Sequence, residues 1–404
     1  MAPDNGSTFG QRVRHARERK GLSRPVLAGL VGRSAEWVKA IEGDRLAMPR
    51  LPLLLRLADA LGVDDLASLT GDERIAAATY TKGSHPCLLR VKEALTSYEV
   101  VVARDAEPAS VAVLADRVAH AWHAWHGVGD HRSRVADLLP ALLADLQHAA
   151  RTHEGADRRR VLALLAQTYH LAQLYLSFQP APDLLMLASD RAMQAAQDAD
   201  SPRAIAAAAW YLNHLFRDAG EQHEARVDLA VRATTLLGPG RGPEDLALTG
   251  LLDLAAALSY AKVGQKGSAE RHWAKADEAA RRLGAYLHPW LIFGQGMVDA
   301  YAITMNNDLV LAGAAVDAAT HIDLGLMPSA TRRSFHIIET ARAHSLHGEP
   351  IAVVHLLKKA VQASPETAMF NIFARGAALD LSATGSPIIR EDARSLARQL
   401  GVAA

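Results

Sequence analysis

The strongest constraint on this chain is a series of helix start and stop signals within its first 45 residues. Ser23 can cap a helix that runs to about Val31, because a serine oxygen accepts the unpaired backbone N–H groups of a first helical turn. After a tight turn, Ser34 can cap a second helix over residues 35–42, and Gly43 suits its carboxyl end. The sequence therefore predicts two short helices joined by one tight turn.

Two more helices flank this pair. One runs from Phe9 to Lys20 and ends at Gly21, and the other covers residues 51–61 after Pro49. In the second of these, apolar residues recur at helical spacing, namely Leu53, Leu54, Leu57, Ala58 and Leu61. Such a stripe predicts a face that is buried in the core of a small helical domain.

This ordered pattern resembles the Xre family, the helix-turn-helix proteins related to the Cro and C1 repressors. The matching elements are Leu22-Ser23, Leu27-Ala28, Val31-Gly32, Ile41-Glu42-Gly43 and Leu57-Ala58-Asp59-Ala60-Leu61-Gly62-Val63. The resemblance implies a five-helix domain at residues 1–72 that binds an operator in double-stranded DNA, and a role as a sequence-specific transcriptional regulator. The alternative is a helical-repeat scaffold or adaptor whose front domain docks a protein partner.

The resemblance also implies which side chains meet DNA. In this fold the second helix of the motif enters the major groove, and its leading residues reach the base edges. Those residues are Ser34, Ala35, Glu36 and Lys39, with phosphate contacts expected from Arg24, Arg33 and Arg45 and further candidates in Arg14 and Arg50. The family often has glutamine where this chain has Arg24, and an ordinary surface role is the alternative for each of these arginines.

Positive charge is concentrated at the same end of the chain. Residues 1–56 hold eleven Lys and Arg against five Asp and Glu, a balance of 11 − 5 = +6, whereas the whole chain has 44 of each sign. A basic front on an acidic body favours a polyanionic partner at the front only, because phosphate contacts dominate nucleic-acid affinity. A solvated basic helix face would give the same balance.

Length and composition favour a multidomain cytoplasmic protein. The chain has 404 residues, half of them hydrophobic, so two or more domains are expected. Its one cysteine, Cys87, forms no internal disulfide, and no apolar run reaches the roughly 18 residues that a membrane span needs. No secretion signal is recognisable. We expect a cytoplasmic protein that associates with the nucleoid when bound to DNA and has no membrane partner.

The rest of the chain predicts a linker at residues 73–109, with one helix at about 88–97, and a helical repeat domain at residues 110–404. A turn residue with an alanine four or five positions after it recurs at Gly220, Gly264, Asn307 and Gly348. These turn residues lie 44, 43 and 41 residues apart, and Ser177 lies 43 residues before the first. Each marks the turn of a helical hairpin. The period exceeds the roughly 34 residues of a tetratricopeptide repeat, so we expect an all-α, tetratricopeptide-like α-solenoid with an extended concave surface.

This architecture resembles the peptide-responsive quorum-sensing regulators of the Rgg, PlcR and NprR kind, and the Ala- and Arg-rich composition resembles actinobacterial proteins. The resemblance implies a homodimer whose solenoid groove binds an effector, either a small signalling molecule or a peptide. Candidate groove residues are Asn213 and Arg217 on one helix and Gln295, Asp299 and Asn306 on another, with exposed polar residues of no special role as the alternative. The aromatic group at residues 286–290 can line a pocket or pack in the core.

The densest imidazole cluster does not have metal-site spacing. His120, His123 and His126 are three residues apart, which spreads the rings around a helix, and no glutamate stands between them. Trp122 and Trp125 are expected to pack inward while the histidines stay partly exposed. No phosphate-binding glycine loop and no nucleophile with a base is recognisable. The sequence therefore predicts no metal, no cofactor and no enzymatic activity.

Overall fold

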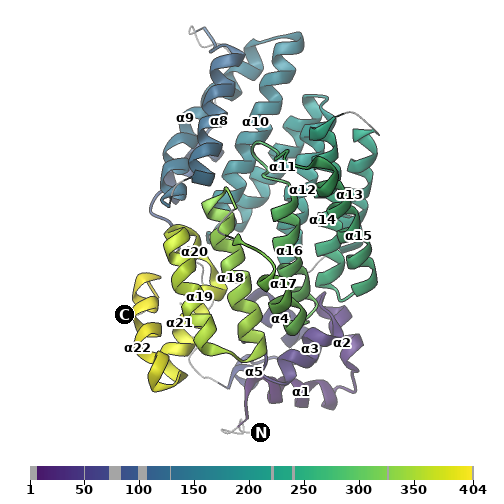
Figure 1. Ribbon diagram of the computed structural model, residues 1–404, viewed down its shortest axis with the longest axis vertical. Coiled ribbons are helices and arrows are strands. Elements are labelled where there is room, and N and C mark those ends of the chain that lie inside the picture. The colour runs from purple at the N-terminus through teal and green to yellow at the C-terminus, as the bar shows by residue number, and fades with distance from the viewer. Residues whose placement is uncertain are drawn as a thin grey trace.

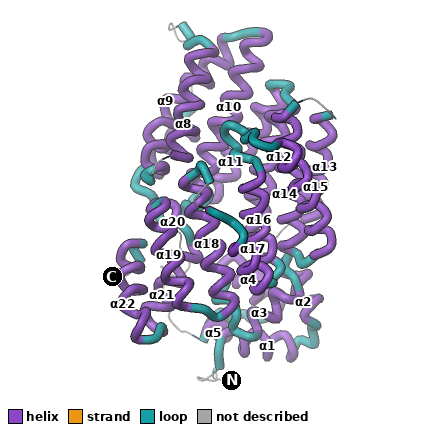
Figure 2. The backbone as a smooth tube through the Cα atoms, viewed as in Figure 1, coloured by secondary structure: helices purple, strands orange, loops and turns teal. Residues whose placement is uncertain are grey.

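The computed structural model describes residues 7–49, 51–71, 83–98, 107–127, 129–219, 223–238, 242–324 and 327–402, without the side chains of residues 216–219. These residues form helices and loops and contain no strand (Figure 2). The prediction of an all-α fold is confirmed. A small domain of α1–α5 lies at one end of a larger helical array (Figure 1).

The small domain has the helices that the start and stop signals predict. They are α1 Phe9–Arg19, α2 Arg24–Val31, α3 Ala35–Glu42, α4 Leu51–Leu61 and α5 Ala67–Thr70. The Ser23 side chain accepts from the backbone N–H of Val26, and Gly32 ends α2 in the left-handed conformation at φ 63°. Gly43 ends α3 at φ −100°, and the left-handed residue at that turn is Asp44 at φ 53°.

The apolar stripe of α4 lies in a core that belongs to this domain alone. Leu54, Leu57 and Leu61 are buried there against Val13 of α1 and Leu27 of α2. This core is separate from the core of the helical array. The domain therefore has the packing of an independent folding unit.

The array continues the chain as helical hairpins. Its helices are α7 Leu88–Thr96, α8 Val111–Gly127, α9 His131–Thr152, α10 Gly155–Leu176, α11 Pro182–Asp198, α12 Pro202–Ala219, α13 His223–Leu237, α14 Pro243–Lys262, α15 Lys266–Leu283, α16 Gln295–Asp308, α17 Ala312–Thr320, α18 Ala330–His347, α19 Pro350–Ala363, α20 Pro365–Phe370, α21 Ile372–Thr384 and α22 Pro387–Gln399. Helix α7, in the segment assigned to a linker, packs on α9 and α11 and buries Val91 and Leu95 in the array core. Structurally it is part of the array.

The turn residues that define the repeat are placed as expected at three positions. Gly264 joins α14 to α15 and Gly348 joins α18 to α19, both left-handed at φ 79° and 84°, and Ser177 ends α10. The expectation for Asn307 is wrong in detail: it lies inside α16, where its side-chain amide donates to the Glu339 carbonyl, and Val310 takes the left-handed conformation. Gly220 lies outside the described residues.

The array closes on itself where the sequence predicts an open concave surface. Helices α8, α10, α12, α14, α16 and α18 each contact the next one, and α18 contacts α8. Alanine lets these inner helices approach closely, and in α14 Ala247, Ala255 and Ala257 are fully or almost fully buried. The inner face of the solenoid is therefore an enclosed interior.

Candidate nucleic-acid interface

The helix-turn-helix motif is formed by α2 and α3, and its turn is built as the caps predict. The Ser34 hydroxyl oxygen accepts from the Trp37 backbone N–H at 3.0 Å, which starts α3 directly after the turn. Val38 and Ile41 are 1% exposed and face the core. Trp37 packs on the same core, 5.9 Å from the Arg33 guanidinium, so its role is packing.

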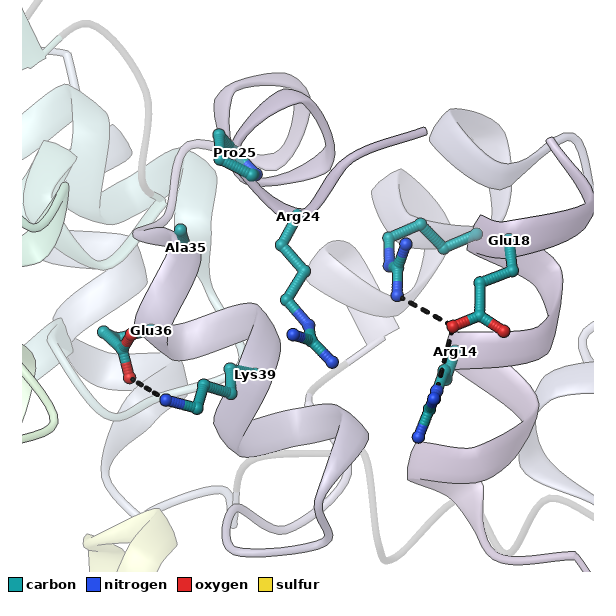
Figure 3. A pocket seen from close by; sticks show the side chains of 8 residues that line it. Arg14, Glu18, Arg24, Pro25, Ala35, Glu36 and Lys39 are labelled. Atoms are coloured by element: carbon teal, nitrogen blue, oxygen red, sulfur yellow. Dashed lines mark hydrogen bonds and ion pairs between the residues drawn. The ribbon is translucent and has the colours of Figure 1, made fainter. Parts of the chain in front are cut away.

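A polar groove of about 570 Å³ lies between α1, α2 and α3. Its lining residues are Arg14, Arg17, Glu18, Arg24, Pro25, Ala35, Glu36 and Lys39, with four cations against two carboxylates. Figure 3 shows Arg24 projecting between the Glu36–Lys39 pair on α3 and the Arg14–Glu18 pair on α1. The Lys39 and Glu36 side chains are more than half exposed and only 3.5 Å apart, so both are available to a ligand in this groove.

Glu42 lies beneath the groove and holds two of its lining arginines in place, a role that the sequence analysis did not predict. Its carboxylate accepts from Arg17 and, at 2.7 Å, from Arg24, and its side chain is only 2% exposed. Burial alone would raise the pKa of Glu42, but the hydrogen bonds from Arg17 and Arg24 keep it below its ordinary value. The only sequence signal was an acidic residue at the end of a helix in a basic segment.

The expected phosphate-binding arginines have different surroundings. The Arg24 side chain is 39% exposed, so its guanidinium can donate a hydrogen bond to a ligand while its Nε bonds Glu42. Arg45 is exposed on the turn after α3, whereas Arg33 is 9% exposed and donates to the Gly32 carbonyl. Arg14 bonds Glu18 at 2.9 Å, and Arg50 lies outside the described residues. Phosphate contact by these arginines stays a prediction.

The tip of α3 is covered by the helical array. Ser34 is 5% exposed, and a Cβ added at Gly264, in the α14–α15 turn, would lie 2.4 Å from the Ser34 Cβ. The expectation that Ser34 faces DNA therefore does not hold in this arrangement, because the array occupies the space in front of it. Arg33 is also buried, and its guanidinium lies within the small domain beside Gly32 and Trp37. Ala35, half-buried, and the exposed Glu36 and Lys39 face the groove.

The structure does not gather the four candidate groove residues whose side chains it describes, Asn213, Gln295, Asp299 and Asn306, into one site. Asn213 is 2% exposed, and its amide bonds two backbone carbonyls and the Ser259 hydroxyl. Gln295 donates to Asp277 and to Asp299. Asn306 donates to the Ala302 carbonyl one turn earlier, and the Arg217 side chain lies outside the described part of the chain. The amide groups of Asn213, Gln295 and Asn306 thus donate to atoms of the protein itself, although Gln295 Oε1 has no partner among the described residues. This leaves effector binding at these three positions without support.

The histidine cluster of α8 is split by burial. Trp122 and Trp125 are buried as expected, and His120 and His123 are exposed. His126 was expected to be partly exposed but is 8% exposed, because its ring nitrogens contact the Ser329 hydroxyl and the Trp290 carbonyl.

Within the ranges that the structure describes, no group of three His, Cys, Asp or Glu side chains is placed to hold a metal ion. In those same ranges, no helix combines the length and hydropathy of a membrane span.

Comparison with known proteins bears on the small domain. Residues 8–69 match a family model described as a helix-turn-helix domain, and this range contains α1 to α4 and most of α5. Comparison of the whole chain with curated proteins finds no match. The chain thus has an amino-terminal helix-turn-helix domain, which supports a DNA-binding regulator.

Proposed function

We propose that this protein is a sequence-specific transcriptional regulator of the Xre type whose helical array controls access of α3 to DNA. The observation that carries the proposal is the contact between Ser34, at the tip of α3, and Gly264 in the array. On this proposal the tetratricopeptide-like array is the sensor and the described arrangement is the closed state. An effector, a small signalling molecule or a peptide, then shifts the population towards an open state.

The contact blocks the DNA-reading end of α3 in the closed state. Base edges lie at the bottom of a major groove about 8.5 Å deep, so the leading turn of a reading helix must project freely. Ser34 instead has array atoms within van der Waals reach. The helix-turn-helix domain has its own core, so it can leave the array without unfolding. Opening therefore requires the loss of the contacts that the helix-turn-helix domain makes with the array, such as the contact between Ser34 and Gly264.

Binding to DNA from upstream of the protein's own gene tests the core of the proposal. Fluorescence anisotropy across a salt series should detect specific binding by the full chain that weakens as salt rises, because phosphate contacts release counterions. Competition with unrelated DNA separates specific from general affinity. If specific binding is absent while a protein partner is retained on the front domain, the chain is a scaffold and the regulator proposal fails.

Lys39→Ala should weaken specific DNA binding by roughly 1–3 kcal/mol, the range for loss of one good base contact. Lys39 is exposed beside the α3 tip, and its Nζ lies 3.5 Å from the carboxylate of the exposed Glu36. Lys358→Ala is the matched control, since Lys358 is an exposed lysine paired at 3.1 Å with Asp392 in the array. Anisotropy titrations of both variants should show loss for the first only. Equal affinities would remove Lys39 from the interface.

We further propose that the protein acts as a cytoplasmic, nucleoid-associated homodimer, since modules of this kind read paired half-sites about one helical turn apart. Sedimentation equilibrium of the full chain tests the dimer. A footprint with two protected half-sites is the expected result on DNA. A monomer that protects a single short site would contradict the dimer while leaving DNA binding intact.

A further inference from the structure

Four charged side chains connect the inner helices α14, α16 and α18 at the end of the array beside the small domain (Figure 1). The carboxylate of Asp308, the last residue of α16, lies 3.2 Å from Lys262 Nζ and 3.1 Å from Arg342 Nη2. Lys262 is the last residue of α14. On α18, Arg342 also lies 3.3 Å from the carboxylate of Glu339, one turn earlier. These four residues form an ion network with Asp308 at its centre.

The ion network is largely shielded from water. The Asp308 side chain is 2% exposed, and the side chains of the other three members are at most 24% exposed. Solvent and salt screen such pairs much less than exposed ones, and removing one member leaves its partner without full compensation. A hydrogen bond supports the same junction, because the Asn307 amide donates to the Glu339 carbonyl at 2.8 Å. The ends of α14 and α16 and the facing part of α18 are therefore held together.

The ion network lies directly behind the turn that covers the tip of α3. Lys262 precedes Gly264 by two residues, and the Gly264 N–H donates to the Ala261 carbonyl at 3.0 Å. This hydrogen bond spans Lys262, so it leaves little freedom between that residue and Gly264. The position of Gly264 in front of Ser34 therefore depends on where Lys262 is held.

The other side of the same turn has a different kind of ion pair. Lys266 follows Gly264 by two residues, and its Nζ lies 3.6 Å from the Glu270 carboxylate on the same helix. Both side chains are more than half exposed, so this pair contributes little to stability. Lys262 thus connects the turn to α16 and α18, whereas Lys266 pairs within α15.

We propose that Lys262 is the positioning residue through which the array sets the contact between Gly264 and Ser34, with Asp308 and Arg342 linking it to α16 and α18. A rearrangement of these inner helices then moves the α14–α15 turn, because the buried charges keep the helices together. Helix α18 also packs on α8, so a change where the ring of inner helices closes reaches Gly264 through the ion network. The inference rests on the proposed function, since it names the residues that regulate the same contact.

Lys262→Met tests this link, because methionine keeps an unbranched apolar side chain and removes the charge that meets Asp308. Fluorescence anisotropy on the full chain should show affinity for the upstream DNA raised by about two- to thirtyfold, the range for substitutions along a coupled network. A lysine that only stabilises the array would not raise DNA affinity when it is replaced. Lys262→Arg keeps a cation at this position and should return the affinity to near its native value.

Lys266→Met is the matched control, since it removes a lysine at the same distance from Gly264, and it should leave DNA affinity unchanged. Asp308→Asn is a second variant that keeps the shape of the side chain, weakens both of its charge contacts and should also raise DNA affinity. Circular dichroism shows that each variant is folded. Hydrogen exchange should be faster in Lys262→Met at the α14–α15 turn and at the turn before α3, and unchanged in α20 to α22.

Comparison with Gly264→Ala, which places a Cβ against Ser34, separates the two levels of the proposal. A gain in Gly264→Ala with none in Lys262→Met or Asp308→Asn would contradict the role of the ion network and leave the proposed function intact. An equal gain in Lys266→Met would contradict it as well. Absence of specific DNA binding, or no gain in Gly264→Ala, would overturn both.

The double variant tests whether Lys262 acts through Gly264. If both act at one contact, Lys262→Met should add less than its own factor to the gain of Gly264→Ala. Full multiplication of the two factors would mean that Lys262 acts at another place, which would contradict its positioning role.

Discussion

Gly264→Ala is expected to raise the affinity of the full chain for its operator by about tenfold or more. This is the effect of destabilising the closed state by about 1.4 kcal/mol relative to the open state. The new Cβ would lie 2.4 Å from the Ser34 Cβ and 3.4 Å from its Cα. The position of an alanine Cβ is set by the backbone, so no side-chain rotation can relieve this overlap. The helix-turn-helix domain must therefore move away from the array. Apparent DNA affinity then rises with the fraction of open molecules.

Gly348→Ala separates this collision from backbone strain. Gly348 is also left-handed, at φ 84° against 79° for Gly264, and it ends a helix at an equivalent hairpin turn. A Cβ at Gly348 has no neighbour within 4 Å, so this variant carries the strain without the contact. Anisotropy titrations should give native affinity for Gly348→Ala. Native affinity for Gly264→Ala, or the same gain in both variants, would mean that the closed arrangement does not restrain DNA binding.

Glu42→Ala is expected to destabilise the helix-turn-helix domain by about 3–5 kcal/mol, because removing one member of a buried ion pair leaves the other charge uncompensated. The partners that remain are Arg24 and Arg17, and the Arg17 side chain is 9% exposed and keeps, as a carboxylate contact among the described residues, only the longer one of 3.4 Å with the half-exposed Glu18. Hydrogen exchange followed by mass spectrometry should show loss of protection in peptides from α1 to α3, with the array unchanged. Glu36→Ala is the control, since Glu36 is 57% exposed and its pair with Lys39 contributes at most about 1 kcal/mol.

Acid should weaken the domain through the same carboxyl. The pKa of Glu42 lies below its ordinary value of 4.5 in the folded chain, so its contribution to stability is complete above that value. The contribution is lost as pH falls from about 4.5 through the lower folded pKa. A denaturation series between pH 7 and pH 3 should show a smaller acid-induced loss in Glu42→Gln than in the native domain. Equal pH dependence in both chains would assign the loss to other groups.

Much of the small domain could be predicted because its signals are local. Ser23 and Ser34 each accept from the backbone N–H three residues later, and Gly32 ends a helix within the same short segment. Such caps depend on residues within one helical turn, so they can be read without knowledge of the fold. The same reason explains why the hairpin turns at Gly264 and Gly348 were located correctly, and why the turn near Asn307, made by Val310, was displaced.

The functional surfaces, by contrast, depend on contacts between distant residues. Glu42 meets arginines 25 and 18 residues away, and Ser34 meets Gly264 across 264 − 34 = 230 residues. Asn213, Gln295 and Asn306 donate to atoms of the protein itself, and the inner helices from α8 to α18 form a closed ring where an open groove was expected. The sequence by itself determined the helices, their caps and most of the turns, since those energies are set between near neighbours. Only the tertiary structure decided which side chains lose water together, and that choice covers the tip of α3 and buries the Glu42 carboxylate against Arg17 and Arg24.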